Sequence, residues 1–230
     1  MPDDPKLLAV LIDADNVPAK HADAILREVT KYGKPGLRRV YGDWSDARLS
    51  GWSKAAQELG LVQHQQSANT KGKNASDIGL VIDAMDILHA GQFDEFVLVS
   101  SDSDFTRLAS RIRESGLTVN VIGERKTPSA LKNACNRFVA IETISQKPDD
   151  KNTDALNKEA KELILGAIEK IDLDVEWYPL NRIGQLIRAD KPDFDPRNYG
   201  HTKLIDMVKT IKGFATKTEG ETNVYIQCEK

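Results

Sequence analysis

The chain has 230 residues, of which 40% are hydrophobic and 29% are charged, and its formal net charge at pH 7 is -3. This length suffices for a medium domain and a small one, and the nearly balanced charge excludes a broadly basic nucleic-acid-binding protein, so any contact with nucleic acid must be a local patch. The two cysteines form neither a disulfide framework nor a metal motif, and no segment is long enough to span a membrane, so we expect a cytoplasmic protein.

Short apolar runs alternate with segments of helical period over the first 141 residues. The runs have the length of strands, and they lie at residues 7–12, 38–41, 61–65, 96–99, 118–122 and 138–141. Helices are expected between them, at residues 18–33, 53–59, 76–91, 105–114 and from 127 onward. This alternation predicts an α/β fold with a parallel sheet flanked by helices on both faces.

The segment from Ser145 to Asp154 contains no apolar residue and carries proline and charge, which indicates a linker. We therefore expect a first domain at residues 1–144, a linker at 145–154 and a second, smaller domain at 155–230. The pattern of the second domain predicts three helices and a terminal hairpin, at residues 155–171, 180–187, 203–211 and 214–227. A small helical or winged-helix-like module fits this order.

Acidic residues follow two of the expected strands directly. Asp13 comes after the first strand, and Asp102 and Asp104 come after the strand at 96–99, in the sequence SSDSDF. Ligands of open parallel sheets bind beyond the carboxyl ends of the strands, near a switch in strand order. Like charges so close together repel each other unless water, a basic side chain, a shared proton or a cation neutralises them.

A further acidic position lies at the start of the helix expected at 76–91. On a helical wheel an apolar stripe that includes Ile78 and Ile82 faces inward, Asp77 lies at the margin of this stripe in the first turn, and Asp83 points toward water. Asp77 is therefore expected to join the acids at the strand ends, and Asp83 is not.

Carboxylates from separate elements that converge on one pocket require a cation, and an all-oxygen ligand set suits Mg²⁺ or Mn²⁺. Such an ion can activate water and stabilise charge on a phosphodiester. Each acid also has a structural interpretation: Asp13 and Asp102 as turn or cap residues, and Asp77 as a charge at a helix N-terminus, worth about 0.3–1 kcal/mol. Spacing alone leaves both interpretations open.

The ordered segments VLIDADN, KGKNASDIGLVIDAMD and LVSSDSDF resemble the NYN domain family, PIN-like nucleases whose bacterial LabA-like/DUF88 group is the nearest part. The resemblance covers residues 6 to about 142 and implies a PIN-like parallel sheet and metal-dependent cleavage of RNA. It implies catalytic and metal-binding roles for Asp13, Asp77, Asp102 and Asp104, and a substrate-binding role for Asn16. Asp15 occupies a slot that is often small or polar in the family, which weakens its case as a ligand.

Further residues of the first domain are candidate substrate contacts. Lys71 and Lys73 stand where the family often has a Lys-Gly pair and are interpreted as phosphate contacts, with solvated loop lysines as the alternative. Arg107 and Arg111 share a helix face within a local basic patch and suit phosphate contacts, with a solvated face as the alternative. Trp44, after a strand end, suits stacking on an unpaired base, worth about 1–3 kcal/mol, with a place in the core as the alternative.

The segment YPLNRIGQLIRADKPDFDPRNYGHTKLIDMVKTI resembles the OST-HTH, or LOTUS, module, a winged-helix-like fold that accompanies NYN domains. This resemblance covers about residues 154–228 and implies binding of RNA or of a protein partner. The candidate contacts are Arg197, Tyr199, His201 and Lys203. Alternatively, Tyr199 belongs to the core and the other three cap a helix.

These residues and resemblances predict a Mg²⁺- or Mn²⁺-dependent endoribonuclease that hydrolyses single-stranded RNA by metal-activated water. An RNA-binding regulatory protein with little or no nuclease activity is the first alternative. A haloacid-dehalogenase-type phosphatase is the second, with Asp13 as nucleophile and Asp15 as general acid, but it would leave Asp77 without a role.

Overall fold

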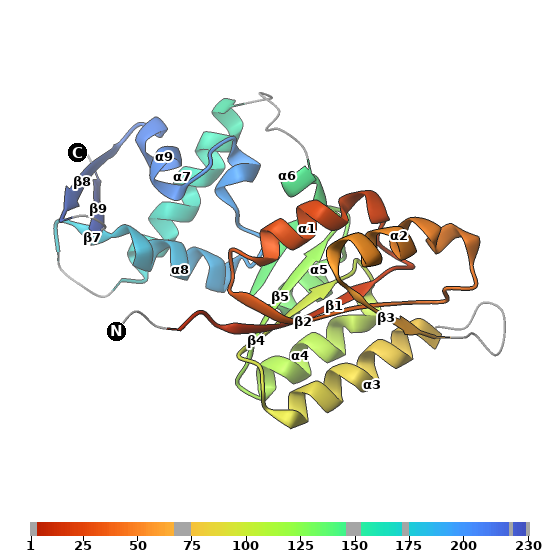
Figure 1. Cartoon of the computed structure of the whole chain (residues 1–230). Coiled ribbons are helices and arrows are strands. Elements are labelled where there is room, and N and C mark those ends of the chain that lie inside the picture. Colours follow the sequence, from red (N-terminus) through yellow and green to blue (C-terminus); the bar gives the residue numbers. More distant parts are fainter. Residues whose placement is uncertain (1–3, 67–74, 146–152, 172–174, 221–222, 229–230) are drawn as a thin grey trace. The chain divides into compact units, whose positions relative to one another are not determined.

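The computed structural model of the chain describes residues 4–66, 75–145, 153–171, 175–220 and 223–228, without the side chains of 75–76 and 153–155. The chain divides into two compact units, Met1–Ser145 and Gln146–Lys230, called unit 1 and unit 2 below (Figure 1). Helix α6 (Ile141–Ser145) runs to the end of unit 1, and helix α7 (Thr153–Glu169) starts two residues earlier than its pattern predicts. Both ends of the expected linker segment are therefore helical.

Unit 1 is built on a six-stranded sheet whose strand pairs are all parallel and whose order is β3-β2-β1-β4-β5-β6. The strands are β1 (Leu7–Asp13), β2 (Lys34–Gly42), β3 (Val62–Gln65), β4 (Glu95–Val99), β5 (Thr118–Gly123) and β6 (Arg137–Ala140). The strand order changes direction between β1 and β4. The predicted α/β class is confirmed, and the switch point lies at the two strands that precede the acids.

Helices cover both faces of this sheet (Figure 1). One face packs against α1 (Ala22–Val29), α2 (Ser50–Leu59) and α6, and the other against α3 (Ala75–Ala90), α4 (Thr106–Glu114) and α5 (Ser129–Ala134). Short 3₁₀ turns at Ala19–His21, Ala47–Leu49 and Ser103–Phe105 lead into α1, α2 and α4.

The central strand β1 shows why this layering follows from the sequence. Leu8, Val10 and Ile12 point into the core under α1 and α2, while Ala9 and Leu11 point into the core under α3 and α4. All five are 0% exposed. An unbroken apolar run is what a parallel strand covered on both faces requires.

Helix α3 packs through a different face from the one the helical wheel predicted. Leu80 and Ala84 are buried, whereas Ile78 and Ile82 are 61% and 58% exposed. The helix is apolar nearly all round, so its sequence offers more than one plausible inward stripe. Asp77 precedes Leu80 by three residues and therefore continues the buried face to the helix start.

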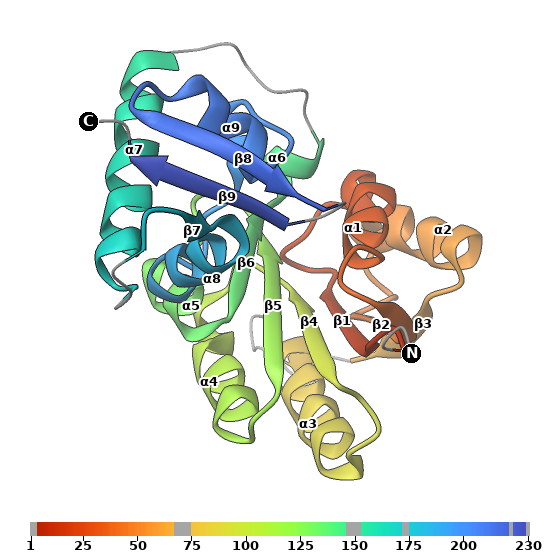
Figure 2. The same cartoon turned by 90° about the vertical axis from the view of Figure 1, so that its left-hand side faces the viewer.

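Unit 2 combines three helices with a small antiparallel sheet (Figure 2). Its elements are α7, β7 (Tyr178–Pro179), α8 (Leu180–Asp190), a 3₁₀ turn (Pro196–Tyr199), α9 (Leu204–Thr210), β8 (Phe214–Glu219) and β9 (Asn223–Cys228). The core includes Ile164 of α7, Ile183 of α8 and Ile226 of β9, each 0% exposed. The expected helices and hairpin are present, and the two-residue strand β7, which pairs with β9, is an addition to them.

In the described part of the chain, no helix combines the length and the apolar character that crossing a bilayer requires.

Candidate functional site

The site is organised around the carboxyl ends of β1 and β4. Asp13, the last residue of β1, stands opposite Tyr41 of β2, and Ile12 stands opposite Val99, the last residue of β4. Neighbouring parallel strands thus end at one level, and their following residues meet at the switch point. Asp13 and Ser100 are 1% and 2% exposed, so the base of the site is polar but closed to solvent.

Asp13 is held by uncharged donors. Its Oδ2 accepts hydrogen bonds from Asn16 Nδ2 and from Ser100 Oγ, each at 2.7 Å. Its Oδ1 accepts from the backbone N–H groups of Asp15 at 3.2 Å and Asn16 at 3.3 Å. The pKa of the Asp13 carboxyl is raised, chiefly by burial, although the hydrogen bonds from Ser100 and Asn16 lower it. The buried carboxylate is therefore oriented by its neighbours without being neutralised by them.

Asp102 and Asp104 follow β4 in a tight turn. Asp102 is the N-cap of the 3₁₀ turn Ser103–Phe105, and its Oδ1 accepts from the backbone N–H of Asp104 at 2.9 Å. The backbone N–H of Asp102 donates to Ser100 Oγ at 3.0 Å. Asp102 is therefore a cap residue, as its structural interpretation predicted. It also lies near Asp13, because Ser100 forms hydrogen bonds with both residues. The side chain of Asp104 is exposed.

Asp77 belongs to the same electrostatic neighbourhood. Its pKa is raised to about 6, first by burial and then by the charges of four other acids, Asp13, Asp102, Asp15 and Asp104. Each of these charged groups disfavours a second negative charge. Carboxylates from the end of β1, the start of α3 and the turn after β4 therefore act on one another across this end of the sheet.

The pKa of Asp77 gives a measurable pH effect. Because the folded-state pKa of about 6 exceeds the ordinary value of 3.8, the extra stability of the protonated fold is full below about pH 4 and is lost as pH rises through 6. Asp77 is partly solvent-exposed, so we discount the effect to about 1 kcal/mol. Urea denaturation in EDTA measures the free energy of unfolding at pH 4 and at pH 7. Between these pH values the wild type should lose about 1 kcal/mol more of this free energy than the Asp77→Asn variant does. Equal declines would contradict the coupling.

The oxygen donors of the site suit a divalent cation by their chemistry. Carboxylate oxygens on a buried, negatively charged base are the ligands that Mg²⁺ and Mn²⁺ prefer, so the chemistry of the site fits such an ion. Within the described ranges, however, no three His, Cys, Asp or Glu side chains are already grouped closely enough to hold a metal. The fit therefore rests on donor chemistry and negative potential, and not on a preformed cage.

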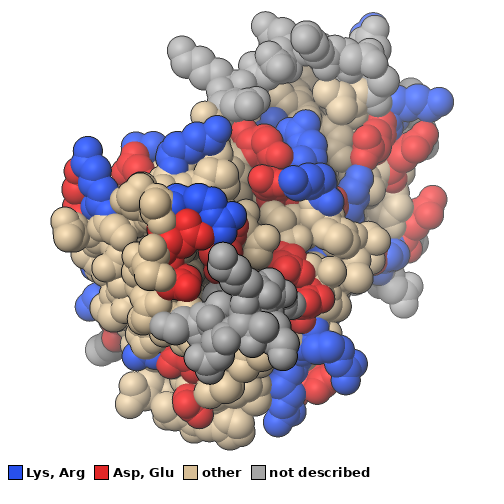
Figure 3. All heavy atoms as spheres, turned by 90° about the vertical axis from the view of Figure 1, so that its right-hand side faces the viewer, with Lys and Arg blue, Asp and Glu red and all other residues tan. Residues whose placement is uncertain are grey.

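The candidate substrate contacts of unit 1 have different surroundings. Lys71 and Lys73 lie outside the described residues. Arg107 is exposed, and Arg111 Nη1 lies 3.9 Å from Glu114 Oε2. Trp44 is partly buried and packs against the core under α1 and α2. This position fits a packing role better than stacking on an unpaired base. The face of the molecule in Figure 3 shows basic and acidic side chains intermingled, as the balanced composition predicts.

In unit 2, the candidate contacts are largely engaged within the unit. Arg197 forms an ion pair with Asp195, with Nη2 at 2.6 Å from Oδ2. Tyr199 is 6% exposed and donates to Glu159 Oε1 at 3.0 Å, and His201 Nε2 lies 3.3 Å from Thr210 Oγ1. Lys203 is exposed at the N-cap of α9. Of these residues, Lys203 is therefore the one placed to meet a ligand.

Two residues near the site escaped the sequence analysis in different ways. Ser100 stands inside the quoted segment SSDSDF, directly after a strand, yet only the structure shows its hydrogen bonds to both Asp13 and Asp102. Asp83 was expected to face water, and this was wrong: it accepts hydrogen bonds from Arg39 at 2.5 Å and from the Tyr41 hydroxyl, and ties α3 to β2. The helical wheel placed Asp83 wrongly because it assumed that the face with Ile78 and Ile82 is buried, whereas the buried face contains Leu80 and Ala84.

Two family models match the chain. A model of the NYN domain matches residues 7–142, and a model of the OST-HTH/LOTUS domain matches residues 136–226. A search of the curated proteins finds no significant match. Four solved chains match, among them a protein of unknown function from Vibrio parahaemolyticus RIMD 2210633. It is 23% identical with a TM-score of 0.53, over 61% of this chain and 96% of that one, and shows the fold alone.

Proposed function

The chain belongs to the NYN domain family and carries an OST-HTH/LOTUS domain, and from this premise we propose that it is a metal-dependent endoribonuclease acting on single-stranded RNA. NYN domains are generally nucleases, and OST-HTH domains bind RNA or proteins. The observation that supports the proposal best is the coupling of carboxylates from three separate segments at the switch point of the sheet. The match to the NYN domain supports a nuclease over the phosphatase alternative.

Asp13, Asp77, Asp102 and Asp104 would hold the Mg²⁺ or Mn²⁺ ion. The bound ion would supply a Lewis acid for a phosphoryl oxygen and a water molecule of lowered pKa. Asn16 and Ser100 fix the orientation of the Asp13 carboxylate in advance, so it need not reorganise when substrate arrives. Exposed Arg107, one turn beyond the acids, would bind a backbone phosphate, and Lys71, Lys73 and Arg111 are assigned the same role.

The test is cleavage of an end-labelled single-stranded RNA with Mg²⁺, with Mn²⁺ and with EDTA. We expect cuts within the RNA strand with either metal, and none in EDTA, because no cation then lowers the pKa of the attacking water or stabilises charge on the phosphate. Readdition of the metal should restore the cutting. Equal cutting in EDTA would contradict the proposal.

RNA binding without cleavage is the second candidate function. It is favoured by the observation that the described acids do not form a closed ligand group. Failure to cut with either metal, while the same RNA still binds, would make this the better description of the protein.

A further inference from the structure

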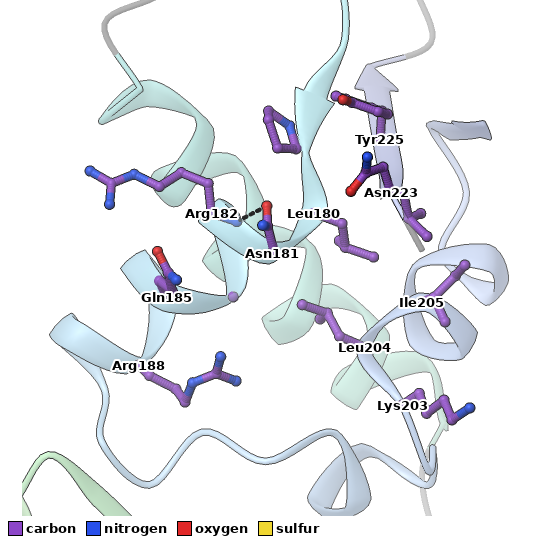
Figure 4. A pocket seen from close by; sticks show the side chains of 13 residues that line it. Leu180, Asn181, Arg182, Gln185, Arg188, Lys203, Leu204, Ile205, Asn223 and Tyr225 are labelled. Carbon is purple, nitrogen blue, oxygen red and sulfur yellow. Dashed lines mark hydrogen bonds between the residues drawn. The ribbon is translucent and has the colours of Figure 1, made fainter. Parts of the chain in front are cut away.

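Unit 2 contains a pocket of about 640 Å³ that the motifs did not indicate (Figure 4). It lies between α8, the start of α9 and strand β9. The polar side chains that line it include Arg182, Arg188, Lys203, Asn223 and Tyr225. None of them belongs to the candidate site at the carboxyl ends of β1 and β4.

The charge of the pocket differs from that of the unit around it. Residues 152–230 hold 12 Lys and Arg against 14 Asp and Glu, which is a slight acidic excess. Arg182, Arg188 and Lys203 nevertheless all line this one pocket, and no Asp or Glu occurs among its described lining residues. A concave surface of one sign attracts a ligand of the opposite sign, so the pocket favours an anionic ligand.

The pocket also has two distinct ends. In Figure 4, Arg188 and Lys203 lie at one end, Asn223 and Tyr225 lie at the other, and apolar side chains such as Leu204 lie between them; Arg182 lies apart from Arg188 and Lys203. Lys217 Nζ lies 5.4 Å from the centroid of the Tyr225 ring, a cation–π contact that helps to order the ring. The ligand therefore carries charge at one end and a planar, hydrogen-bonding group at the other.

The floor of the pocket depends on a glycine inside α8. A Cβ at Gly184 would lie 3.0 Å from Leu204 Cδ2, which is closer than ordinary van der Waals contact. A glycine within a helix costs about 1 kcal/mol relative to alanine. Here it lets α8 and α9 approach closely and leaves room for the guanidinium of Arg188, whose Nη2 would lie 3.5 Å from that Cβ.

We propose that this pocket binds one nucleotide unit of a single-stranded RNA, with the phosphate at Arg188 and Lys203 and the base against Tyr225 and Asn223. This inference rests on the proposed function, in which RNA is the substrate. An extended acidic peptide fits less well, because it needs positive charge along its whole length, whereas the pocket has its amide and aromatic side chains at the end away from Arg188 and Lys203. The base must be unpaired, since its face and its edge are both contacted.

The test measures binding of a fluorescein-labelled 12-nucleotide RNA by anisotropy, with the full chain in EDTA so that metal-dependent cleavage is suppressed. The double variant Arg188→Gln/Lys203→Gln should bind at least about tenfold more weakly and should lower the slope of log K against log salt by about 1.4, two phosphate contacts at 0.7 each. Tyr225→Leu should weaken binding about tenfold and leave the slope unchanged, because stacking releases no counterion. The matched control Lys209→Gln/Lys212→Gln removes two exposed lysines of the same unit outside the pocket and should change binding less than about twofold.

Several outcomes would overturn this assignment. If the pocket variant and the control variant lose RNA affinity equally, the RNA is held by diffuse electrostatic attraction and not by the pocket. If the wild type does not bind the RNA at all, RNA is not the ligand. Displacement of the RNA by an equal concentration of adenosine monophosphate would assign the pocket to a free nucleotide, and displacement by polyglutamate would assign it to an acidic peptide. The binding assay contains no metal, so it tests the pocket separately from the nuclease. If the pocket assignment is wrong but the nuclease is real, the pocket variants will cut saturating RNA at the rate of the wild type.

Discussion

Replacement of Asp13 by asparagine is expected to lower metal-dependent RNA cleavage by at least about 100-fold. Substitutions that only disturb the support of a metal ligand already cost about 10–100-fold, so loss of a ligand should cost no less. The fold should survive, because burial raises the pKa of this carboxyl and a neutral amide relieves that cost. Ser100 Oγ, which donates to Asp13 Oδ2 at 2.7 Å, can accept from the new amide instead. Initial cleavage rates and thermal unfolding of both proteins measure the two effects.

The matched control is Asp86→Asn, the same chemical change at an exposed position of α3. It should leave the cleavage rate within about twofold of the wild type, because a solvated charge away from the acids contributes little. Equal cutting by the wild type and by Asp13→Asn would contradict the acid site and would point to a contaminating nuclease. A large loss in both variants would mean that charge in general, rather than the acid site, supports cleavage.

Replacement of Trp52 by alanine is expected to lower the free energy of unfolding of unit 1 by about 3–5 kcal/mol, a large part of the roughly 5–15 kcal/mol of a typical domain. Trp52 is 1% exposed, and its Nε1 donates to the carbonyl oxygen of Val17 at 2.6 Å. Val17 belongs to the loop that follows Asp13, so the variant should also lose RNA cleavage in proportion to the loosening of that loop. Urea denaturation at fixed metal concentration measures the stability.

A second tryptophan of unit 1 provides the contrast. The indole N–H of Trp44 is buried and has no hydrogen-bond partner among the described residues, in contrast to that of Trp52. Trp52→Phe should therefore destabilise by about 1–3 kcal/mol, because the Val17 carbonyl loses its donor, whereas Trp44→Phe should be neutral or stabilising. Equal destabilisation by both changes would contradict this difference in hydrogen bonding.

The sheet and its acids could be predicted because their signals are local. A strand buried on both faces must be an unbroken apolar run, as Leu8 to Ile12 are, and such runs can be counted along the chain. Asp13 directly follows the first of these runs, and Asp102 follows the run at 96–99 after two serines. Parallel pairing then places both at one edge of the sheet, whatever the details of packing.

The remaining features depend on which face of an element is buried and on contacts between distant residues. The phase of α3 could not be predicted because the helix is apolar nearly all round. The contacts of Asp83 with Arg39 and Tyr41 follow from that phase. The pocket of unit 2 joins α8 to β9, residues about 40 positions apart, and a motif in one segment cannot report it.

The position of β1 in the middle of the sheet has a consequence for synthesis on the ribosome. Its neighbours β2 and β4 are made at residues 34–42 and 95–99, so one edge of β1 stays unpaired until more than a third of the chain has followed it. The acids of the proposed site likewise come together only after Asp104 has been made. A nascent or truncated chain that ends before Asp104 therefore lacks the complete acid set, and a nuclease that uses this set would stay inactive toward its own message at that stage.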